Sequence, residues 1–190
     1  MNNKTCSEFN VIDEFKELTI EEINKRLRKA AFPYAVLMQH IQGDFNIGTM
    51  IRNANAFNSE KVFYLGKKKY DRRGTVGTHH YSDLKYIREL DSLRELKNEY
   101  CFIGIDNIEG SQSIYDFPWD KYEIATKQNQ PGYRKALFLF GEENNGLIPE
   151  VLEMCQVVVH IPQYGSVRSL NVGTASGIIM NEFVRKCASI

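Results

Sequence analysis

The sequence predicts an α/β fold, with a mainly parallel sheet flanked by helices. Five short runs are continuously apolar instead of alternating, as expected of strands that are covered on both faces: residues 34–39, 61–65, 101–105, 136–140 and 157–161. Segments with helical periodicity lie between or after them: residues 47–57, 83–98, 149–155 and 170–186. Alternation of strand and helix along the chain is typical of a parallel sheet.

The first 30 residues predict a helical extension. Thr19 and Glu22 match a capping box, and an apolar stripe follows at helical spacing (Ile20, Ile23, Leu27). Basic residues end this helix: Lys25, Arg26, Arg28 and Lys29. The β-like texture starts after Pro33, so we divide the chain into residues 1–30 and a single domain of residues 31–190.

The bulk composition excludes some classes of protein. With 190 residues and 43% hydrophobic residues, the chain can bury one core. No apolar run approaches the roughly 18 residues of a membrane span, and the first residues contain no apolar secretory segment. The cysteines are scattered and form no C-x-x-C pair (Cys6, Cys101, Cys155, Cys187). We therefore expect a cytoplasmic protein with no membrane partner.

A metal site is not expected. His79 and His80 are adjacent, but no second group of ligands accompanies them, and the scattered cysteines do not supply one. These two histidines are better interpreted as residues that shape a loop.

Net charge favours no particular partner. The formal net charge is zero and the pI is about 6.9, whereas a nucleic-acid-binding domain typically has a pI above roughly 9. Positive charge is nevertheless concentrated in one loop: Lys67, Lys68, Lys69, Arg72 and Arg73. Both a solvated surface and contact with RNA remain open for this loop.

Ligands gather at the carboxyl ends of parallel strands, and three segments there contain polar residues. The first is D-F-N-I-G-T-M-I-R-N-A-N-A-F-N. Asn46 suits the N-cap of a helix, and Arg52 falls one to two turns inside it. Two explanations of this segment are equally good: a helix cap followed by an exposed arginine, or a functional role.

The second segment is F-G-E-E-N-N-G-L. Adjacent carboxylates at the end of an apolar strand are costly unless they are hydrogen-bonded or exposed. A plain turn before a helix would also account for this segment, which is neither a phosphate loop nor a Rossmann glycine motif.

The third segment is I-P-Q-Y-G-S-V-R-S-L-N-V. Its backbone could surround a small ligand, and Ser169 and Asn171 offer side-chain hydrogen bonds. Gly173 and Gly177, on one face of the next helix, permit close packing. Close packing explains the glycines, but it does not explain Ser169 and Asn171.

In this order the three segments resemble the motifs of the SpoU/TrmH family of RNA ribose 2′-O-methyltransferases, in the SPOUT superfamily. N-I-G-T-M-I-R-N-A-N-A-F is similar to the first, L-F-G-E-E-N-N-G-L to the second and I-P-Q-Y-G-S-V-R-S-L-N-V-G-T-A-S-G-I to the third. The resemblance covers residues 34–187. It departs from the family where Asn58 stands for glycine, Glu142 for asparagine, and Gly173 for another small residue.

The resemblance implies a SPOUT methyltransferase domain whose C-terminal segment forms a trefoil knot, and a homodimer through the last helix. It implies S-adenosylmethionine as cofactor, held largely by backbone groups at Gly141, Ile161 and Leu170, with Ile105 less strongly implied. The implied catalytic set is Arg52, Asn46, Glu143, Ser169 and Asn171.

The implied reaction is methylation of a ribose 2′-hydroxyl. A guanidinium is a poor free base, so we expect Arg52 to bind the 2′-oxygen and the neighbouring phosphate; whether it also takes the proton is open. RNA would contact the basic loop (Lys67, Lys68, Lys69, Arg72, Arg73) and the basic end of the N-terminal helix.

Transfer RNA is favoured as the substrate because the chain is short and lacks a large separate RNA-binding domain. Ribosomal RNA is the alternative substrate. Other hypotheses are base methylation, a non-catalytic RNA-binding protein of the same fold, and a flavodoxin-like binder of small molecules.

Overall fold

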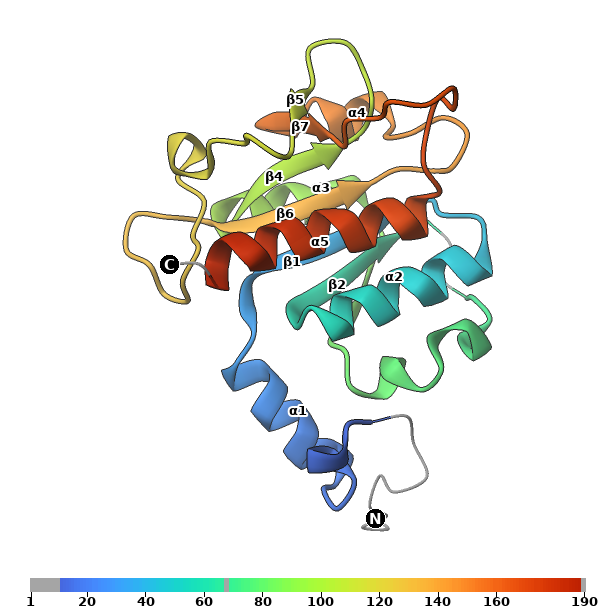
Figure 1. Cartoon of the computed structure of the whole chain (residues 1–190), viewed down its shortest axis with the longest axis vertical. Coiled ribbons are helices and arrows are strands. Elements are labelled where there is room, and N and C mark those ends of the chain that lie inside the picture. The colour runs from blue at the N-terminus through green and yellow to red at the C-terminus, as the bar shows by residue number, and fades with distance from the viewer. Residues whose placement is uncertain (1–10, 67–68, 189–190) are drawn as a thin grey trace.

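The computed structural model describes residues 11–66 and 69–188. Its centre is a seven-stranded sheet in the order β3-β2-β1-β6-β4-β7-β5, and every strand pair is parallel (Figure 1). The strands are β1 Phe32–Gln39, β2 Ser59–Leu65, β3 Leu84–Ile87, β4 Tyr100–Ile105, β5 Gln112–Ser113, β6 Lys135–Phe140 and β7 Val157–His160. The predicted α/β fold with a mainly parallel sheet is confirmed.

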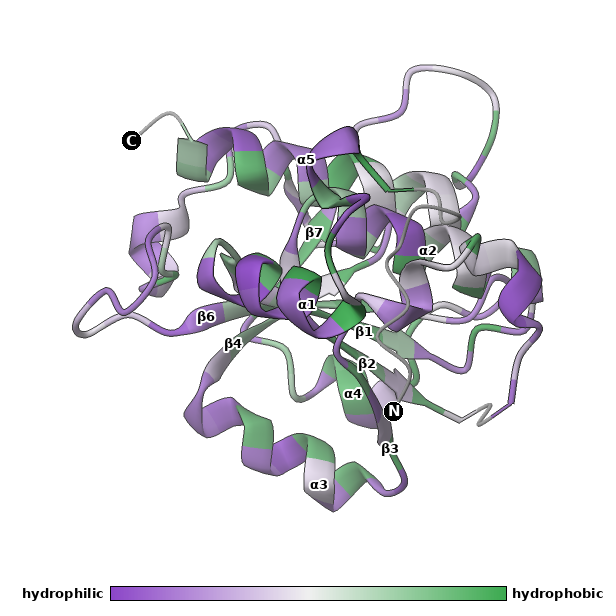
Figure 2. Ribbon diagram, turned by 90° about the horizontal axis from the view of Figure 1, so that it is seen from below, coloured by the Kyte–Doolittle hydropathy of each residue, from purple (hydrophilic) through white to green (hydrophobic). Residues whose placement is uncertain are grey.

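Helices cover both faces of the sheet. The α-helices are α1 Ile20–Lys29, which packs apart from the sheet, and α2 Asp44–Ala56, α3 Leu90–Glu95, α4 Pro149–Leu152 and α5 Val172–Ala188. Helices α2 and α5 lie together on one face and α3 on the other, as Figures 1 and 2 show from two directions. Within the described ranges, no helix has the length and apolar character needed to cross a membrane.

The central strands β1, β4 and β6 are mostly apolar because each of them contributes to two cores. Val36 and Phe138 pack in the core that includes α2 and α5. Their neighbours Leu37 and Leu139 pack in the core that includes α3 and α4. All four side chains are fully buried. Successive residues of a strand face opposite sides, so the continuous apolar runs of the sequence follow directly from this three-layer arrangement.

The helix predicted over residues 83–98 is wrong in its first part. Residues Leu84–Ile87 form β3, which pairs with β2 at the edge of the sheet, and the helix α3 begins only at Leu90. The exposed edge of β2 offers unpaired backbone groups that this segment satisfies, so pairing overrides the local helical pattern. The short strand β5 was not predicted, and α4 ends at Leu152, before the predicted residue 155.

The predicted N-terminal helix is present as α1, with its capping box. The backbone N–H of Thr19 donates to the Glu22 carboxylate at 2.8 Å, and the N–H of Glu22 donates to the Thr19 hydroxyl at 3.3 Å. Ile23 is buried and packs against Tyr81, and Asn24 Nδ2 donates to the carbonyl of His80 at 3.3 Å. Helix α1 is thereby fixed to the segment that precedes β3.

Asn58 stands where glycine closes the motif that the first segment resembles, and its backbone has a conformation that suits glycine. Its φ is 46°, in the left-handed region that glycine favours and asparagine tolerates. Its side-chain amide also donates to the carbonyl of Leu27 at 3.2 Å, a contact that glycine could not make. The departure from the motif therefore ties α1 to the domain.

Candidate active site

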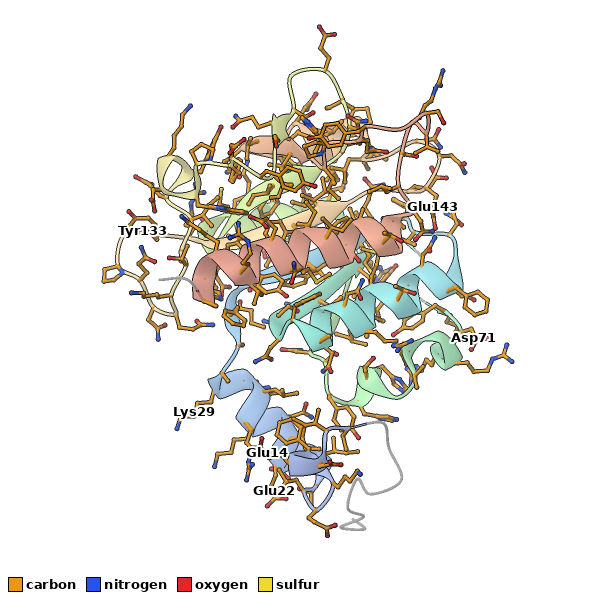
Figure 3. All side chains as sticks on the ribbon, viewed as in Figure 1. Glu14, Glu22, Lys29, Asp71, Tyr133 and Glu143 are labelled. Carbon is orange, nitrogen blue, oxygen red and sulfur yellow. The ribbon has the colours of Figure 1, made fainter. Side chains whose placement is uncertain are left out.

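The strand register brings the three motif segments to one edge of the sheet. Met38 of β1 and Ile105 of β4 both pair with Phe140 of β6, and Ile105 also pairs with Val159 of β7. Because these strands are parallel, the loops that follow them leave from the same edge. Figure 3 labels Glu143 at this edge, beside the N-terminal ends of α2 and α5.

The carboxylate of Glu143 is the centre of the hydrogen-bond network at this edge. It accepts from the side-chain amide of Asn46 at 2.8 Å and from the backbone N–H groups of Gln42 and Gly43 at 3.1 Å each. Partial burial raises the pKa of Glu143, but these hydrogen bonds together outweigh burial and lower it below its usual value. Glu143 is therefore ionised at neutral pH and holds the loop after β1.

Asn46 has a different role from the predicted N-cap. Helix α2 begins at Asp44 with Gly43 as its N-cap, so Asn46 lies inside the first turn. Its Nδ2 donates to Glu143, and its Oδ1 accepts from Asn171 Nδ2 at 2.9 Å. The Oδ1 of Asn171 accepts from the N–H of Thr174 at 3.2 Å, in the first turn of α5.

These contacts form a relay that runs from Glu143 through Asn46 to Asn171. The partners are 97 and 125 residues apart in sequence, and each belongs to a different motif. The amide of Asn46 can serve both partners only in one orientation, since its nitrogen faces a carboxylate and its oxygen faces an amide donor. The relay therefore fixes the three loops relative to one another.

Arg52 is exposed on α2. Within residues 11–66 and 69–188 its guanidinium has no hydrogen-bond or ion-pair partner. The helix that carries it is held on two sides. Asn53 donates to the carbonyl of Gly173 at 2.9 Å and to the hydroxyl of Ser176 at 3.0 Å, both on α5. On the other side, a β-carbon at Gly48 would lie 2.5 Å from the carbonyl carbon of Gly74. Arg52 thus presents a full positive charge from a fixed helix.

An open cavity of about 500 Å³ lies among the loops after β4, β6 and β7. This volume is in the range of small-molecule sites. Six of the predicted site residues line it: Ile105, Glu143, Ile161, Ser169, Leu170 and Asn171. Arg52 and Asn46 lie outside the lining.

Gly141 is also outside the lining, between two residues that belong to it. A β-carbon at Gly141 would lie 2.0 Å from the carbonyl carbon of Gly146. Any larger residue would therefore push the 141–147 turn apart. The lack of a side chain at Gly141 therefore allows the wall of the cavity to close.

The polar residues of this cavity that were not predicted include Asp106, Gln163 and Arg168. The Asp106 carboxylate accepts from the N–H of Leu147 at 3.3 Å and so joins the loops after β4 and β6. Gln163 Oε1 is buried and accepts no hydrogen bond from the described residues. One signal could have revealed Asp106, a carboxylate directly after an apolar strand, but nothing in the motif marked the other two.

The cavity suits a ligand that combines an apolar ring system with amino groups. Ile105, Ile161 and Leu170 supply apolar surface. The orphan oxygen of Gln163 needs a donor, because a buried acceptor without a partner is costly, and Asp106 offers negative charge. Adenosine with an attached amino acid meets these requirements, so the residues present fit S-adenosylmethionine.

The basic loop is only partly described. Lys67 and Lys68 lie outside the described residues. Lys69 and Arg72 are exposed, whereas the guanidinium of Arg73 pairs with Asp71, at 2.7 Å from Nε and 2.5 Å from the terminal nitrogen. Much of the charge of Arg73 is therefore already neutralised. In Figure 3 Asp71 and Glu143 are labelled on opposite sides of α2.

Comparison with known proteins identifies relatives of two kinds. The chain is 26% identical over 178 residues to the tRNA (guanosine(18)-2′-O)-methyltransferase of Aquifex aeolicus, which covers 89% of this chain and 79% of that protein. It is also 26% identical over 177 residues to the 23S rRNA (guanosine-2′-O-)-methyltransferase RlmB of Haemophilus ducreyi, with 90% of this chain and 67% of that protein covered.

Solved structures share the fold. The A. aeolicus TrmH/SpoU tRNA modifying enzyme matches with a TM-score of 0.72 and 23% identity, over 90% of this chain and 85% of that chain. The SpoU methyltransferase AviRb from Streptomyces viridochromogenes, solved in complex with AdoMet, matches with a TM-score of 0.67 and 24% identity. That match covers 82% of this chain but 58% of AviRb.

The family model with the description SpoU rRNA methylase matches residues 33–181, which is most of the chain and includes all three motifs. This match confirms the predicted membership. The chain belongs to the SpoU rRNA methylase family.

Proposed function

We propose that this protein transfers the methyl group of S-adenosylmethionine to a ribose 2′-hydroxyl of RNA. The enzyme class follows from the family and from two relatives, which are named as methyltransferases of tRNA and of rRNA. The observation that carries the proposal is the relay from Glu143 through Asn46 to Asn171, which joins all three motifs beside a cavity of suitable size.

When bound, S-adenosylmethionine supplies a methyl group on a positively charged sulfur. Ile105, Ile161 and Leu170 would hold its adenosine part. Gln163 and Asp106 would accept hydrogen bonds from its amino groups, which would satisfy the orphan oxygen of Gln163. Gly141 serves the same site indirectly because it lets the 141–147 turn close.

Arg52 orients the acceptor ribose. A guanidinium stays charged at neutral pH, so Arg52 binds the 2′-oxygen and the adjacent phosphate and stabilises the negative charge that develops on that oxygen. The oxygen–carbon bond forms as the sulfur–carbon bond breaks. The hydroxyl proton leaves to solvent, since a charged guanidinium has only donor groups and cannot accept it.

Glu143 and Asn46 are positioning residues. The lowered pKa of Glu143 makes it a weak base, and its oxygens already accept hydrogen bonds from Gln42, Gly43 and Asn46. Its contribution is to hold the start of α2, and hence Arg52, in register with the cavity. Ser169 and Asn171 position the segment that borders the cavity on the α5 side.

Transfer RNA is the proposed substrate, because the chain covers 79% of the A. aeolicus tRNA enzyme. Ribosomal RNA is the second candidate, on the strength of the RlmB relatives. The same proposal includes a trefoil knot in the segment before α5 and a homodimer through α5. It also includes a cytoplasmic location, the absence of a metal, and a division of the chain at residues 30/31. Two hydrogen bonds support the knot, because they hold the segment before α5 against other loops. They join Asn107 to Arg168 and Asn46 to Asn171.

The test uses labelled S-adenosylmethionine and separate tRNA and rRNA fractions from cells that lack the gene. The labelled RNA is digested to nucleosides, which are identified by mass spectrometry. A 2′-O-methylated nucleoside in the tRNA fraction supports the proposal in full, and one in the rRNA fraction changes only the substrate. A methylated base, or no transfer to either fraction by folded protein, would overturn it.

A further inference from the structure

Two basic segments that are far apart in sequence line one cavity. This cavity of about 640 Å³ lies between α1 and the segment from residue 69 to β3. We call it the basic cavity and define it by Arg28, Lys69, Tyr70, Arg72, His79 and Asp83, which are among its lining residues. It is distinct from the cofactor cavity, with which it shares no lining residue.

The charges of the basic cavity are not balanced. Arg28, Lys69 and Arg72 face one carboxylate, that of Asp83, so the described lining has two excess positive charges when its histidines are neutral. In residues 11–66 and 69–188 the side chains of these three cations make no ion pair. Their sequence neighbours differ in this respect: Arg26 pairs with Glu14 and Arg73 pairs with Asp71. Unpaired cations around a hollow favour an anionic ligand.

The walls of the basic cavity are held in place by contacts of their own. The hydroxyl of Thr75 donates to the carbonyl of Arg72 at 2.7 Å and lies 2.6 Å from His79 Nδ1. Because the single proton of the Thr75 hydroxyl is directed to Arg72, Nδ1 of His79 is the donor in the second contact. On the opposite wall, α1 is fixed by Ile23 and by the hydrogen bond from Asn24.

We propose that the basic cavity binds a backbone phosphate of the RNA substrate, at a nucleotide other than the one that is methylated. This inference rests on the proposed function. Arg52 lies on α2, and α2 packs, through the close approach of Gly48 to Gly74, on the 72–75 turn that carries Arg72. In Figure 1 α2 lies between α5 and the segment that contains Arg72. An RNA chain with its reacting ribose at Arg52 would reach the basic cavity by crossing α2.

The test compares two double variants with the same change of charge. Arg28→Gln with Arg72→Gln removes two cations of the basic cavity. Lys121→Gln with Lys127→Gln is the charge-matched control, because these residues neither line the cavity nor belong to the basic segments predicted to contact RNA. All four side chains are exposed, so folding is not at risk, and thermal unfolding verifies this. The affinity for deproteinised bulk tRNA is measured over a series of salt concentrations.

Each lost phosphate contact reduces the slope of log affinity against log salt by about 0.7–0.9. The cavity variant loses the one proposed phosphate contact and should therefore lose about 0.7–0.9 from the slope, together with about tenfold in affinity at physiological salt. The control should change less than threefold, and the affinity of both variants for S-adenosylmethionine should equal that of the unaltered protein. The value of KM for RNA should rise in the cavity variant with little change in kcat.

Equal effects in the two variants would overturn the inference, because general surface charge would then explain the binding. A shift in thermal unfolding with inorganic phosphate alone, lost in the cavity variant while tRNA affinity is unchanged, would also overturn it and would indicate a small-anion site. Failure of the proposed function is seen separately, as absence of methyl transfer by the unaltered protein.

Discussion

Replacement of Glu143 by glutamine tests the relay with the smallest change of shape. The Oε1 of Glu143 accepts from Asn46 and Gly43, and Oε2 accepts from the N–H of Gln42. In the variant the amide oxygen can keep the first two hydrogen bonds, at about half the strength of charge-assisted ones. The amide nitrogen would then face the N–H of Gln42, donor against donor.

The stability loss follows from these contacts. Two weakened hydrogen bonds and one lost hydrogen bond amount to about 2–3 kcal/mol for a buried carboxylate. Glu143 is only partly buried, so screening by solvent reduces the expected loss to about 1–2 kcal/mol. In a chain of this size that corresponds to a decrease in Tm of roughly 3–6 °C.

The loss of activity should exceed the loss of stability. A shift of the start of α2 by about 1 Å displaces Arg52, and such a displacement can cost about 10²-fold in rate. Thermal unfolding measures the first effect, and methyl transfer under single-turnover conditions, at a temperature where the variant is folded, measures the second.

Glu142→Gln is the matched control. Glu142 has the same charge and the adjacent position, but its carboxylate accepts hydrogen bonds from Asn144 and Asn145, within its own turn. It should keep nearly full activity. If the two variants lose activity equally, or if Glu143→Gln keeps full activity, the relay does not position Arg52.

Three further predictions follow from the site. Arg52→Ala should bind S-adenosylmethionine normally by calorimetry and lose at least about 10²-fold in kcat; unchanged turnover would remove Arg52 from the mechanism. Gly141→Ala should lose about 1–3 kcal/mol of stability together with cofactor binding, since its β-carbon meets backbone at 2.0 Å, whereas Gly165→Ala, with open space around it, should lose neither. Because the pKa of Glu143 is lowered in the folded state, its stabilisation is complete above the unfolded value of about 4.3 and is lost as pH falls through the folded value. The difference in Tm between the unaltered protein and Glu143→Gln should therefore shrink below about pH 4, and a difference independent of pH would contradict the assigned charge.

The strands were predictable because burial on both faces leaves a local mark in the sequence. The run at residues 136–140, for example, reappears as β6 with one residue added at its start. The segment at 84–87 was misread because an edge strand with only one buried residue has no such mark. Its pairing depends on the exposed edge of β2, which no local pattern reveals.

The members of the site were predictable as residues but not as an arrangement. Asn46 looked like a helix cap, because the sequence cannot show that Glu143 and Asn171 come within hydrogen-bond distance of its amide. The two basic segments were visible separately, but their meeting at one cavity depends on the packing of Ile23 against Tyr81. Long-range contacts of this kind follow from sheet order and register, not from spacing along the chain.

The most direct test of the account is alkaline hydrolysis of RNA that the protein has labelled from S-adenosylmethionine. Alkali cleaves RNA through the 2′-hydroxyl, so a nucleotide methylated there stays joined to its 3′ neighbour. We predict that the label is recovered in dinucleotides with the unaltered protein and is absent with Arg52→Ala. Label recovered in mononucleotides would mean that a base is methylated, and it would contradict the proposed reaction.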